Sequence, residues 1–371
     1  MNNYAELKDS NTTKSDAIEN EMTLKRYVSM VFVSTCTFPL FFVSVLFFVI
    51  IGSQSTVALK LKACPDNLQL KLNSGCNGDE ALCVRTYNNV AYATMHNAFA
   101  TSQDGFAIAQ HRACMRSGLT SGIRAFMLDV HLTASGELKL CHALCSLGSS
   151  SLTNALSMFA EFLRLNPREI VTIIWEFGVD GREKKTPEDK ASLKRLLGIA
   201  MRSTGLFPYL YSKEPGQVWP TLNEMIAKDS RLVSLTDTWT SLDESWDMYM
   251  WDYTFETKFD SKSQADLDKS CVLNRGSSGN ALLILNHFTI VGAIGIDTKV
   301  TDTLAQYTGI DTLYGINQEP YMWNRISDCA ECLGRFPNFV TVDFWESSDV
   351  IPLVKKLNSV TLPSNQSKCI Y

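Results

Sequence analysis

The chain has 371 residues, of which 45% are hydrophobic, 20% charged and 10% aromatic. These proportions are those of a folded globular protein, and the length allows one large domain or two small ones. The formal net charge is −5, and no block rich in lysine and arginine occurs anywhere in the sequence. A nucleic-acid-binding protein normally carries a basic face, so no nucleic-acid partner is expected.

Residues 27–51 form an apolar stretch without a single charged side chain. A helix rises about 1.5 Å per residue, so a stretch of this length can cross a bilayer core of about 30 Å. We therefore predict a transmembrane signal anchor, preceded by a disordered tail at 1–26. Lys25 and Arg26 directly precede the stretch and favour a cytoplasmic N-terminus, with the rest of the chain lumenal or extracellular. The alternative is a signal peptide cleaved near 52–55, which would make the protein secreted.

The cysteines indicate an oxidising compartment. Of the 11 cysteines, only Cys36 lies in 27–51, and an even number follows it: Cys64, Cys76, Cys83, Cys114, Cys141, Cys145, Cys271, Cys329, Cys332 and Cys369. That density is typical of disulfide-bonded lumenal or extracellular proteins, whereas the alternative is a set of reduced cytosolic thiols. The triplet Asn365-Gln366-Ser367 is compatible with N-glycosylation in the same compartment.

Residues 52–86 hold three cysteines and several turn-forming residues, and they predict a linker or cap. In 87–371 short apolar runs alternate with amphipathic stretches. Several runs are rich in Val, Ile and aromatic residues and do not alternate with polar ones, as expected for strands buried on both faces. We expect strands at Val90–Met95, Ile123–Val130, Leu138–Cys141, Ile170–Trp175, Arg231–Leu235, Met248–Tyr253, Ala281–Leu285 and Phe339–Val342, and helices at Thr153–Leu165, Pro187–Ser203 and Val350–Leu357.

Eight strands with intervening helices predict an α/β fold of the (β/α)8 TIM-barrel type at 87–371. The alternative is a doubly wound parallel sheet, but no glycine-rich phosphate loop follows the first strand.

In a parallel barrel the carboxyl ends of all strands meet at one rim. Polar residues lie at the end of every predicted strand or shortly after it, namely His96 and Asn97, Asp129 and His131, His142, Glu176, Asp237, Asp252, Asn286 and His287, and Asp343. We therefore expect one active site at this rim, with His131 in a structural role and His111 on the surface.

Four segments of this rim carry a resemblance to a known family: 92–100 with His96-Asn97, 122–129 ending in Asp129, 140–142 ending in His142, and 166–176 ending in Glu176. In order and spacing they resemble the motifs of the X domain of eukaryotic phosphatidylinositol-specific phospholipases C. The later segments 286–288 and 338–344 are similar to the small branch of this family that contains an X domain alone. The resemblance implies a phospholipase-C-like phosphodiesterase barrel.

The resemblance also implies roles for single residues. His96 and His142 match the two catalytic histidines. Independently of the resemblance, the chemistry of a phosphodiester cleavage would let Glu176 or Asp129 orient a histidine, polarise the attacking hydroxyl or hold a cation. Asn97, Asp129 and Glu176 match the ligands that hold Ca²⁺ in the metal-dependent branch.

Two departures leave the metal question open. Met127 stands where the metal-dependent branch has a further acidic ligand. Asp129 stands where the metal-independent bacterial branch has an arginine. Ca²⁺ or another hard divalent cation is therefore one expectation, and catalysis without metal is the other.

The chemistry of these residue types predicts a phosphoric diester hydrolase. Histidine exchanges protons near neutral pH, so two histidines can deprotonate an attacking hydroxyl and protonate a leaving oxygen. We assign protonation of the leaving group to His96 and expect His142 to share the proton transfers. The substrate would be a membrane phospholipid, a glycolipid or another lipid-linked phosphodiester. The predicted substrate pocket contains Arg124, as the positive counterpart of the phosphate, with Asp237, Asp252, His287 and Asp343.

Two other functions are compatible with the sequence. The chain could be a catalytically inactive, membrane-anchored binding protein that retains both histidines. It could also be a glycerophosphodiesterase or an enzyme like sphingomyelinase D. Those enzymes need a Glu-x-Asp metal motif on the second strand, and Met127-Leu128-Asp129 lacks the glutamate.

Overall fold

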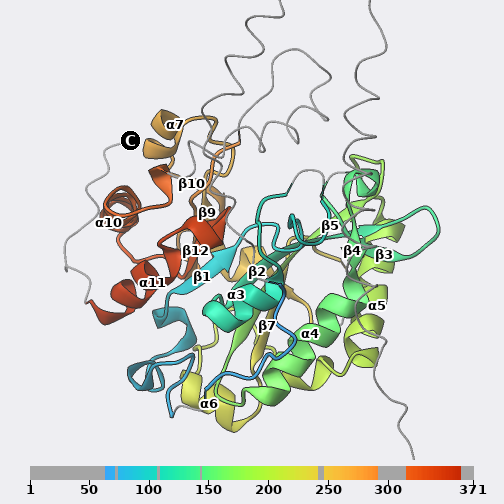
Figure 1. Cartoon of the computed structure of the whole chain (residues 1–371), viewed down its shortest axis with the longest axis horizontal. Coiled ribbons are helices and arrows are strands. Elements are labelled where there is room, and N and C mark those ends of the chain that lie inside the picture. Colours follow the sequence, from blue (N-terminus) through green and yellow to red (C-terminus); the bar gives the residue numbers. More distant parts are fainter. Residues whose placement is uncertain are drawn as a thin grey trace, which may run out of the picture. The chain divides into compact units, whose positions relative to one another are not determined.

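A curled, mainly parallel sheet organises the described part of the chain (Figure 1). The computed structural model describes residues 63–71, 74–106, 109–142, 144–240, 246–290 and 315–360. The predicted tail, the predicted membrane span at 27–51 and the sequon at Asn365 lie outside these residues. Among the described residues, no helix combines the length and apolar character needed to cross a membrane.

Eight parallel strands form the main sheet, in the order β9-β11-β12-β1-β2-β5-β7-β8. They are β1 (Tyr92–Met95), β2 (Ala125–Leu132), β5 (Val171–Val179), β7 (Leu232–Thr236), β8 (Met248–Tyr249), β9 (Thr254–Thr257), β11 (Leu282–Asn286) and β12 (Phe339–Val342). In the ranges given above, no ladder joins β8 to β9, so the sheet is open between these two strands. The predicted α/β class with parallel strands is confirmed, whereas closure into a complete barrel is not seen.

Four further strands lie at the margins of this sheet: β3 (Leu138–Leu140), β4 (Ser150–Ser151), β6 (Leu210–Tyr211) and β10 (Leu273–Gly276). The run at 138–141 was predicted as a parallel barrel strand, and this prediction is wrong. Strand β3 pairs antiparallel with β2, because the short turn at 133–137 returns the chain along the edge of β2. The predicted strand Met248–Tyr253 is interrupted by a 3₁₀ turn, η5 (Met250–Asp252), which separates β8 from the unpredicted β9.

Helices α3 (Met115–Ser121), α4 (Leu152–Leu165), α5 (Pro187–Ser203), α6 (Leu222–Ala227), α7 (Gln264–Asp268), α10 (Tyr321–Leu333) and α11 (Val350–Ser359) connect the strands. Short 3₁₀ turns occur at η1 (Glu80–Leu82), η2 (Tyr87–Asn89), η3 (Cys145–Leu147), η4 (Phe207–Tyr209) and η6 (Trp345–Ser347). Helix α5 begins where the sequence predicted, because Thr186 and Asp189 form a reciprocal capping box around Pro187. Helix α11 packs against β1 and β12, and α5 packs against β2 and β5 (Figure 1).

Alternate residues of the strands line the two faces of the sheet. The face under the helices, here called the outer face, carries Ala93, Met95, Phe126, Leu128, Val130, Val171, Ile173, Trp175, Leu232, Leu285, Val340 and Val342. The opposite, inner face carries Tyr92, Ala125, Met127, Ile174, Val233, Leu235, Leu282, Ile284 and Phe339. Because side chains alternate along a strand, these two sets fix which face each later residue of a strand occupies.

Aromatic residues close the inner face at the amino ends of the strands. The ring of Tyr87 stacks on Tyr92 and Trp219 at centroid distances of 5.1 and 4.8 Å. Its hydroxyl lies 2.5 Å from the Thr172 hydroxyl at the start of β5. The inner face is therefore packed at its amino end and can be polar only toward the carboxyl ends of the strands.

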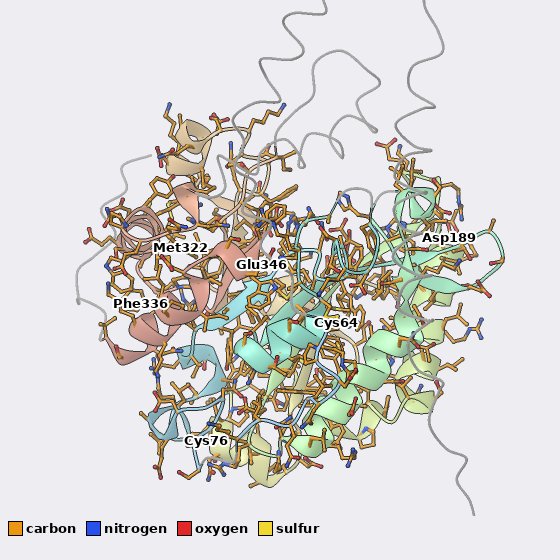
Figure 2. The ribbon with its side chains drawn as sticks, viewed as in Figure 1. Cys64, Cys76, Asp189, Met322, Phe336 and Glu346 are labelled. Carbon is orange, nitrogen blue, oxygen red and sulfur yellow. A yellow bond between two sulfur atoms is a disulfide. The ribbon has the colours of Figure 1, made fainter. Side chains whose placement is uncertain are left out.

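Disulfides tie the segment before β1 and the later loops to the fold, which confirms the predicted oxidised state of the cysteines. The bonds join Cys64 to Cys114, Cys76 to Cys83, Cys141 to Cys145 and Cys271 to Cys329, and Cys332 is disulfide-bonded as well. Figure 2 shows Cys64 beside α3, whose N-cap is Cys114, and Cys76 in the N-terminal segment.

Candidate active site

The alternation of the strands brings one group of polar residues onto the inner face, at the carboxyl ends of the strands. Thr94 of β1 points inward, so His96, two residues later, points inward as well. By the same alternation, Asp129, Glu176 and Asp237 point inward at the carboxyl ends of β2, β5 and β7. On the other side of β1, the same rule places Asp343 after β12, Asn286 on β11 and Glu256 on β9. These residues come from seven strands and are the candidate active site.

His96 is held in one orientation by two neighbours. Its Nδ1 lies 2.9 Å from Oδ1 of Asp343, and the two side chains are 17% and 1% exposed. The ring of Phe288, which follows β11, stacks on the imidazole at 3.9 Å with an interplanar angle of 6°. A carboxylate at Nδ1 directs the proton of that nitrogen, so Nε2 is the atom that can exchange a proton with a substrate.

His111, predicted to be on the surface, is instead fully buried behind His96. Its Nε2 donates to the His96 carbonyl oxygen at 2.6 Å, and burial lowers its pKa to about 4. A neutral, buried histidine therefore fixes the backbone of His96. The sequence offered no signal for this, since the segment that carries His111 is neither a helix nor a strand.

His142 follows β3 and is half-buried within the loop closed by the Cys141–Cys145 disulfide. Burial lowers its pKa to about 4, and the nearby positive charge of His96 acts in the same direction, whereas Asp343 raises it. The two predicted catalytic histidines therefore lie close enough to interact electrostatically. At neutral pH the His142 imidazole is uncharged and can accept a proton.

Three inward carboxyl groups, Asp129, Glu176 and Asp237, form a carboxylate trio beside the histidines. Asp129 and Glu176 are direct partners in the register of β2 and β5. Burial raises the pKa of all three groups, and the charge of Asp237 raises those of Asp129 and Glu176 further. The side chain of Glu176 is nevertheless accessible to solvent. The trio can accept protons or hydrogen bonds from hydroxyl groups.

Two cations near this trio were missed by the sequence analysis. Lys185, in the loop before α5, donates to the Phe177 carbonyl oxygen and lies 3.8 Å from Oδ2 of Asp237. Arg275 on β10 pairs with Glu256. Both positive charges lower the pKa values of Glu176 and Asp237. Neither cation follows a predicted strand, so no sequence signal pointed to them.

Three predicted pocket residues lie elsewhere. Arg124 is on the outer face at the start of β2, where it pairs with Glu169 at 2.7 Å and donates to the carbonyl oxygens of Leu119 and Ile123. His287 is fully buried on the outer face, one residue past the inward Asn286. Asp252 is exposed in η5, before the amino end of β9. Arg124 and His287 were misplaced because side chains alternate between the two faces of a strand. An error of one residue therefore puts a side chain on the wrong face.

The predicted metal ligands form an imperfect set of donors for a hard cation. Oriented to satisfy its hydrogen bonds, the Asn97 amide donates to Oδ1 and Oδ2 of Asp129 at 3.0 and 3.2 Å, and its oxygen faces Gln110. Met127 packs against the inner apolar cluster. An amide nitrogen is not a ligand for Ca²⁺, which takes six to eight oxygens. Half a turn of the same amide would place its oxygen beside the Asp129 carboxylate, so the three residues are an incomplete set of oxygen donors, and calcium binding stays a prediction.

Comparison with known proteins identifies the family. The model of the PI-PLC X domain, described as PI-PLC X 1, matches residues 82–358, which include every residue of the candidate site. The chain belongs to the PI-PLC X domain family.

Three curated relatives share its sequence. An "Uncharacterized secreted protein" of Arthroderma benhamiae is 25% identical over 77% of this chain and 64% of its own length. A "PI-PLC X domain-containing protein 1" of the same fungus is 24% identical over 84% of this chain and 97% of its own. "PI-PLC X domain-containing protein At5g67130" of Arabidopsis thaliana is 25% identical over 74% and 63%. The PI-PLC X family member described here therefore spans less than two thirds of the first and third relatives.

Solved structures of bacterial enzymes are similar as well. A point mutant of the phosphatidylinositol-specific phospholipase C from Staphylococcus aureus aligns with a TM-score of 0.48 and 15% identity, over 76% of this chain and 94% of that one. A calcium-dependent phosphoinositol-specific phospholipase C from Pseudomonas aligns with a TM-score of 0.34 and 13% identity, over 73% and 94%.

Proposed function

We propose that this chain is a phosphodiesterase that cleaves the head-group phosphodiester of a phospholipid or glycolipid by acid/base catalysis with two histidines. One observation carries the proposal. His96, which Asp343 holds in place, and the uncharged His142 form a pair of histidines, and the carboxylate trio lies beside this pair. Membership of the PI-PLC X family supports the same chemistry.

The reaction requires two proton transfers in opposite directions. A hydroxyl of the head group attacks phosphorus, and its proton passes to neutral His142. The bond from phosphorus to the lipid oxygen breaks, and that oxygen takes a proton from Nε2 of His96, so a cyclic phosphate leaves with the head group. Asp343 stabilises the charged form of His96, and the carboxylate trio, with Glu176 the most accessible, would orient the attacking hydroxyl.

The proposed location is outside the cytosol. The disulfides fit a lumenal or extracellular domain, and one relative is named a secreted protein. Whether the segment at 27–51 stays as an anchor or is removed determines only how the enzyme reaches a membrane-bound substrate.

The test is release of a phosphorylated head group from vesicles by the full-length chain, produced under oxidising conditions. Substrates are phosphatidylinositol, a glycosylated inositol lipid and a glycerophosphodiester. We expect release from at least one of them, and loss by a factor of about 10² to 10⁴ in both His96→Ala and His142→Ala. No release by a protein that unfolds cooperatively would instead favour the catalytically inactive binding protein.

A substrate in which p-nitrophenol replaces the lipid alcohol, with the head group and its attacking hydroxyl retained, separates the two roles, because p-nitrophenolate departs without a proton. We expect this substrate to restore much of the rate of His96→Ala but none of that of His142→Ala. The opposite pattern would reverse the assignment of acid and base.

A further inference from the structure

Arg275 lies where the curled sheet is open. Its strand, β10, pairs antiparallel with β9, and because the other edge of β9 pairs with β11, β10 occupies the edge that faces β8. All residues of β10 are exposed, so its ladder with β9, rather than burial in the core, holds this strand.

The local backbone brings Arg275 toward the inner face. The register of β10 shifts between Leu273 and Arg275, and Arg275 lies opposite Glu256. A bulge of this kind redirects a side chain. At the next residue, Gly276, a Cβ atom would lie 2.3 Å from the Thr254 carbonyl oxygen, so only glycine allows β10 to approach β9 this closely.

The guanidinium of Arg275 is fixed but not enclosed. Its Nε bonds to Oε1 of Glu256, a carboxylate that is 3% exposed and accepts a further bond from Asn286 Nδ2 at 3.2 Å. The rings of Trp251 and Phe259 lie 4.8 and 4.5 Å from its central carbon. The side chain is still 45% exposed, and its two terminal nitrogens have no hydrogen-bond partner among the described residues.

We propose that Arg275 binds a phosphate group of the substrate through these terminal nitrogens. A planar guanidinium held at one edge presents the other nitrogens as a fork that matches two phosphate oxygens. Arg275 contacts Glu256, an inner-face residue of the candidate site that also accepts a bond from Asn286, so its guanidinium lies at this site. In agreement with that position, its charge lowers the pKa values of Glu176 and Asp237. Lys185 is a weaker candidate, because the Phe177 carbonyl oxygen and Asp237 already engage its ammonium group.

This inference rests on the proposed phosphodiesterase function, and the phosphate has two possible sources. It is either the group that is cleaved or a second phosphate on the head group. Both present the same chemistry to Arg275, and the substrate series below distinguishes them.

Binding is measured first, without turnover, by calorimetric titration of the full-length chain with inorganic phosphate and with myo-inositol 1-phosphate. We expect Arg275→Gln to weaken binding of at least one of these probes about tenfold or more, and Arg275→Lys, which keeps the charge but loses the fork, to weaken it less. Arg116→Gln is the matched control, since Arg116 forms a partly exposed ion pair with Glu161 on the outer helices. Unchanged binding by folded Arg275→Gln, or equal loss in Arg116→Gln, would overturn the proposal.

Turnover then identifies the phosphate. Equal loss of kcat/KM by Arg275→Gln on phosphatidylinositol and on phosphatidylinositol 4-phosphate assigns Arg275 to the scissile phosphate. Loss on the second substrate alone assigns it to the head group. If no lipid is cleaved but phosphate binding still depends on Arg275, the anion site stands and the proposed activity fails.

Discussion

His96 and His287 follow strands of the same sheet, and they lie on opposite faces of it. His96 is on the inner face, partly exposed, with one ring nitrogen on Asp343 and the other available to a substrate. His287 is on the outer face and fully buried, and both of its nitrogens are engaged: Nε2 by the Ile316 carbonyl oxygen at 2.9 Å and Nδ1 by Arg325 at 3.2 Å.

The difference shows what separates a reactive histidine from a structural one in this fold. Arg325 also donates to the carbonyl oxygen of Asn286 and to the hydroxyl of Ser270, so His287 belongs to a closed network between β11 and α10. Such a network stabilises the fold and leaves no atom for a substrate. Mutations at the two histidines should therefore separate activity from stability.

The largest effect is expected for His96→Ala. Loss of a proton-transferring group should lower kcat/KM by about 10³-fold, equivalent to about 4 kcal/mol of transition-state stabilisation. The free energy of unfolding, measured in urea, should change by less than about 1 kcal/mol, because the side chain is partly exposed. If His96→Ala kept the wild-type rate, or failed to fold, the distinction between a reactive histidine on the inner face and a structural one on the outer face would be lost.

Asp343→Asn should lower kcat/KM by about 10²-fold. The amide keeps the shape of the carboxylate but no longer stabilises the charged form of His96. We expect the loss mainly in kcat, so a rise in KM alone would indicate that Asp343 contacts the substrate instead.

The sequence pattern predicts that polar residues gather at the carboxyl ends of the strands, but it does not show which face of each strand points inward. In β1, Tyr92, Thr94 and His96 lie on the same face of the strand. Once Tyr92 is placed in the inner apolar cluster, His96 must therefore point inward too. Strand β11 is Leu-Leu-Ile-Leu-Asn and is apolar on both faces, so nothing in it shows whether Asn286 or His287 points inward. Helix α5 was predicted at its observed bounds because its cap is a local signal. Arg275 could not be predicted, because its position depends on a bulge and on pairing at an open edge.

Removal of His287 should affect stability rather than activity. His287→Ala leaves Nη1 of Arg325 and the Ile316 carbonyl oxygen without their partners and opens a cavity, so we expect a loss of about 2 kcal/mol in the free energy of unfolding. The specific activity of the folded fraction should remain within about threefold of that of the wild type. A loss of activity comparable to that of His96→Ala would place His287 in the active site after all.

The effect of His287 on stability should depend on pH. Burial, followed by the charge of Arg325, lowers its pKa to about 3 in the folded protein, whereas an unfolded histidine titrates near 6.5. Between these values the unfolded chain binds a proton that the folded chain does not. The contribution of His287 is therefore complete above about pH 6.5 and falls by about 1.4 kcal/mol per pH unit below it. The difference between the wild type and His287→Ala should close near pH 5 in urea titrations, and a constant difference would contradict the buried neutral state.

The smallest effect is expected for removal of divalent cations. The Asn97 amide faces Asp129, Met127 supplies no oxygen ligand, and Lys185 and Arg275 already place positive charge near the carboxylate trio. We therefore expect a chelator to change the initial rate by less than about twofold, whereas Arg275→Gln lowers it much further.

If instead the chelator abolishes the rate and calcium alone restores it, then Asn97, Asp129 and Glu176 hold a cation. The Asn97 amide must in that case turn its oxygen toward the ion. With that result, His96 on the inner face would still be the reactive histidine and His287 on the outer face the structural one. The positive charge that balances the phosphate would, however, come from the metal rather than from Lys185 and Arg275.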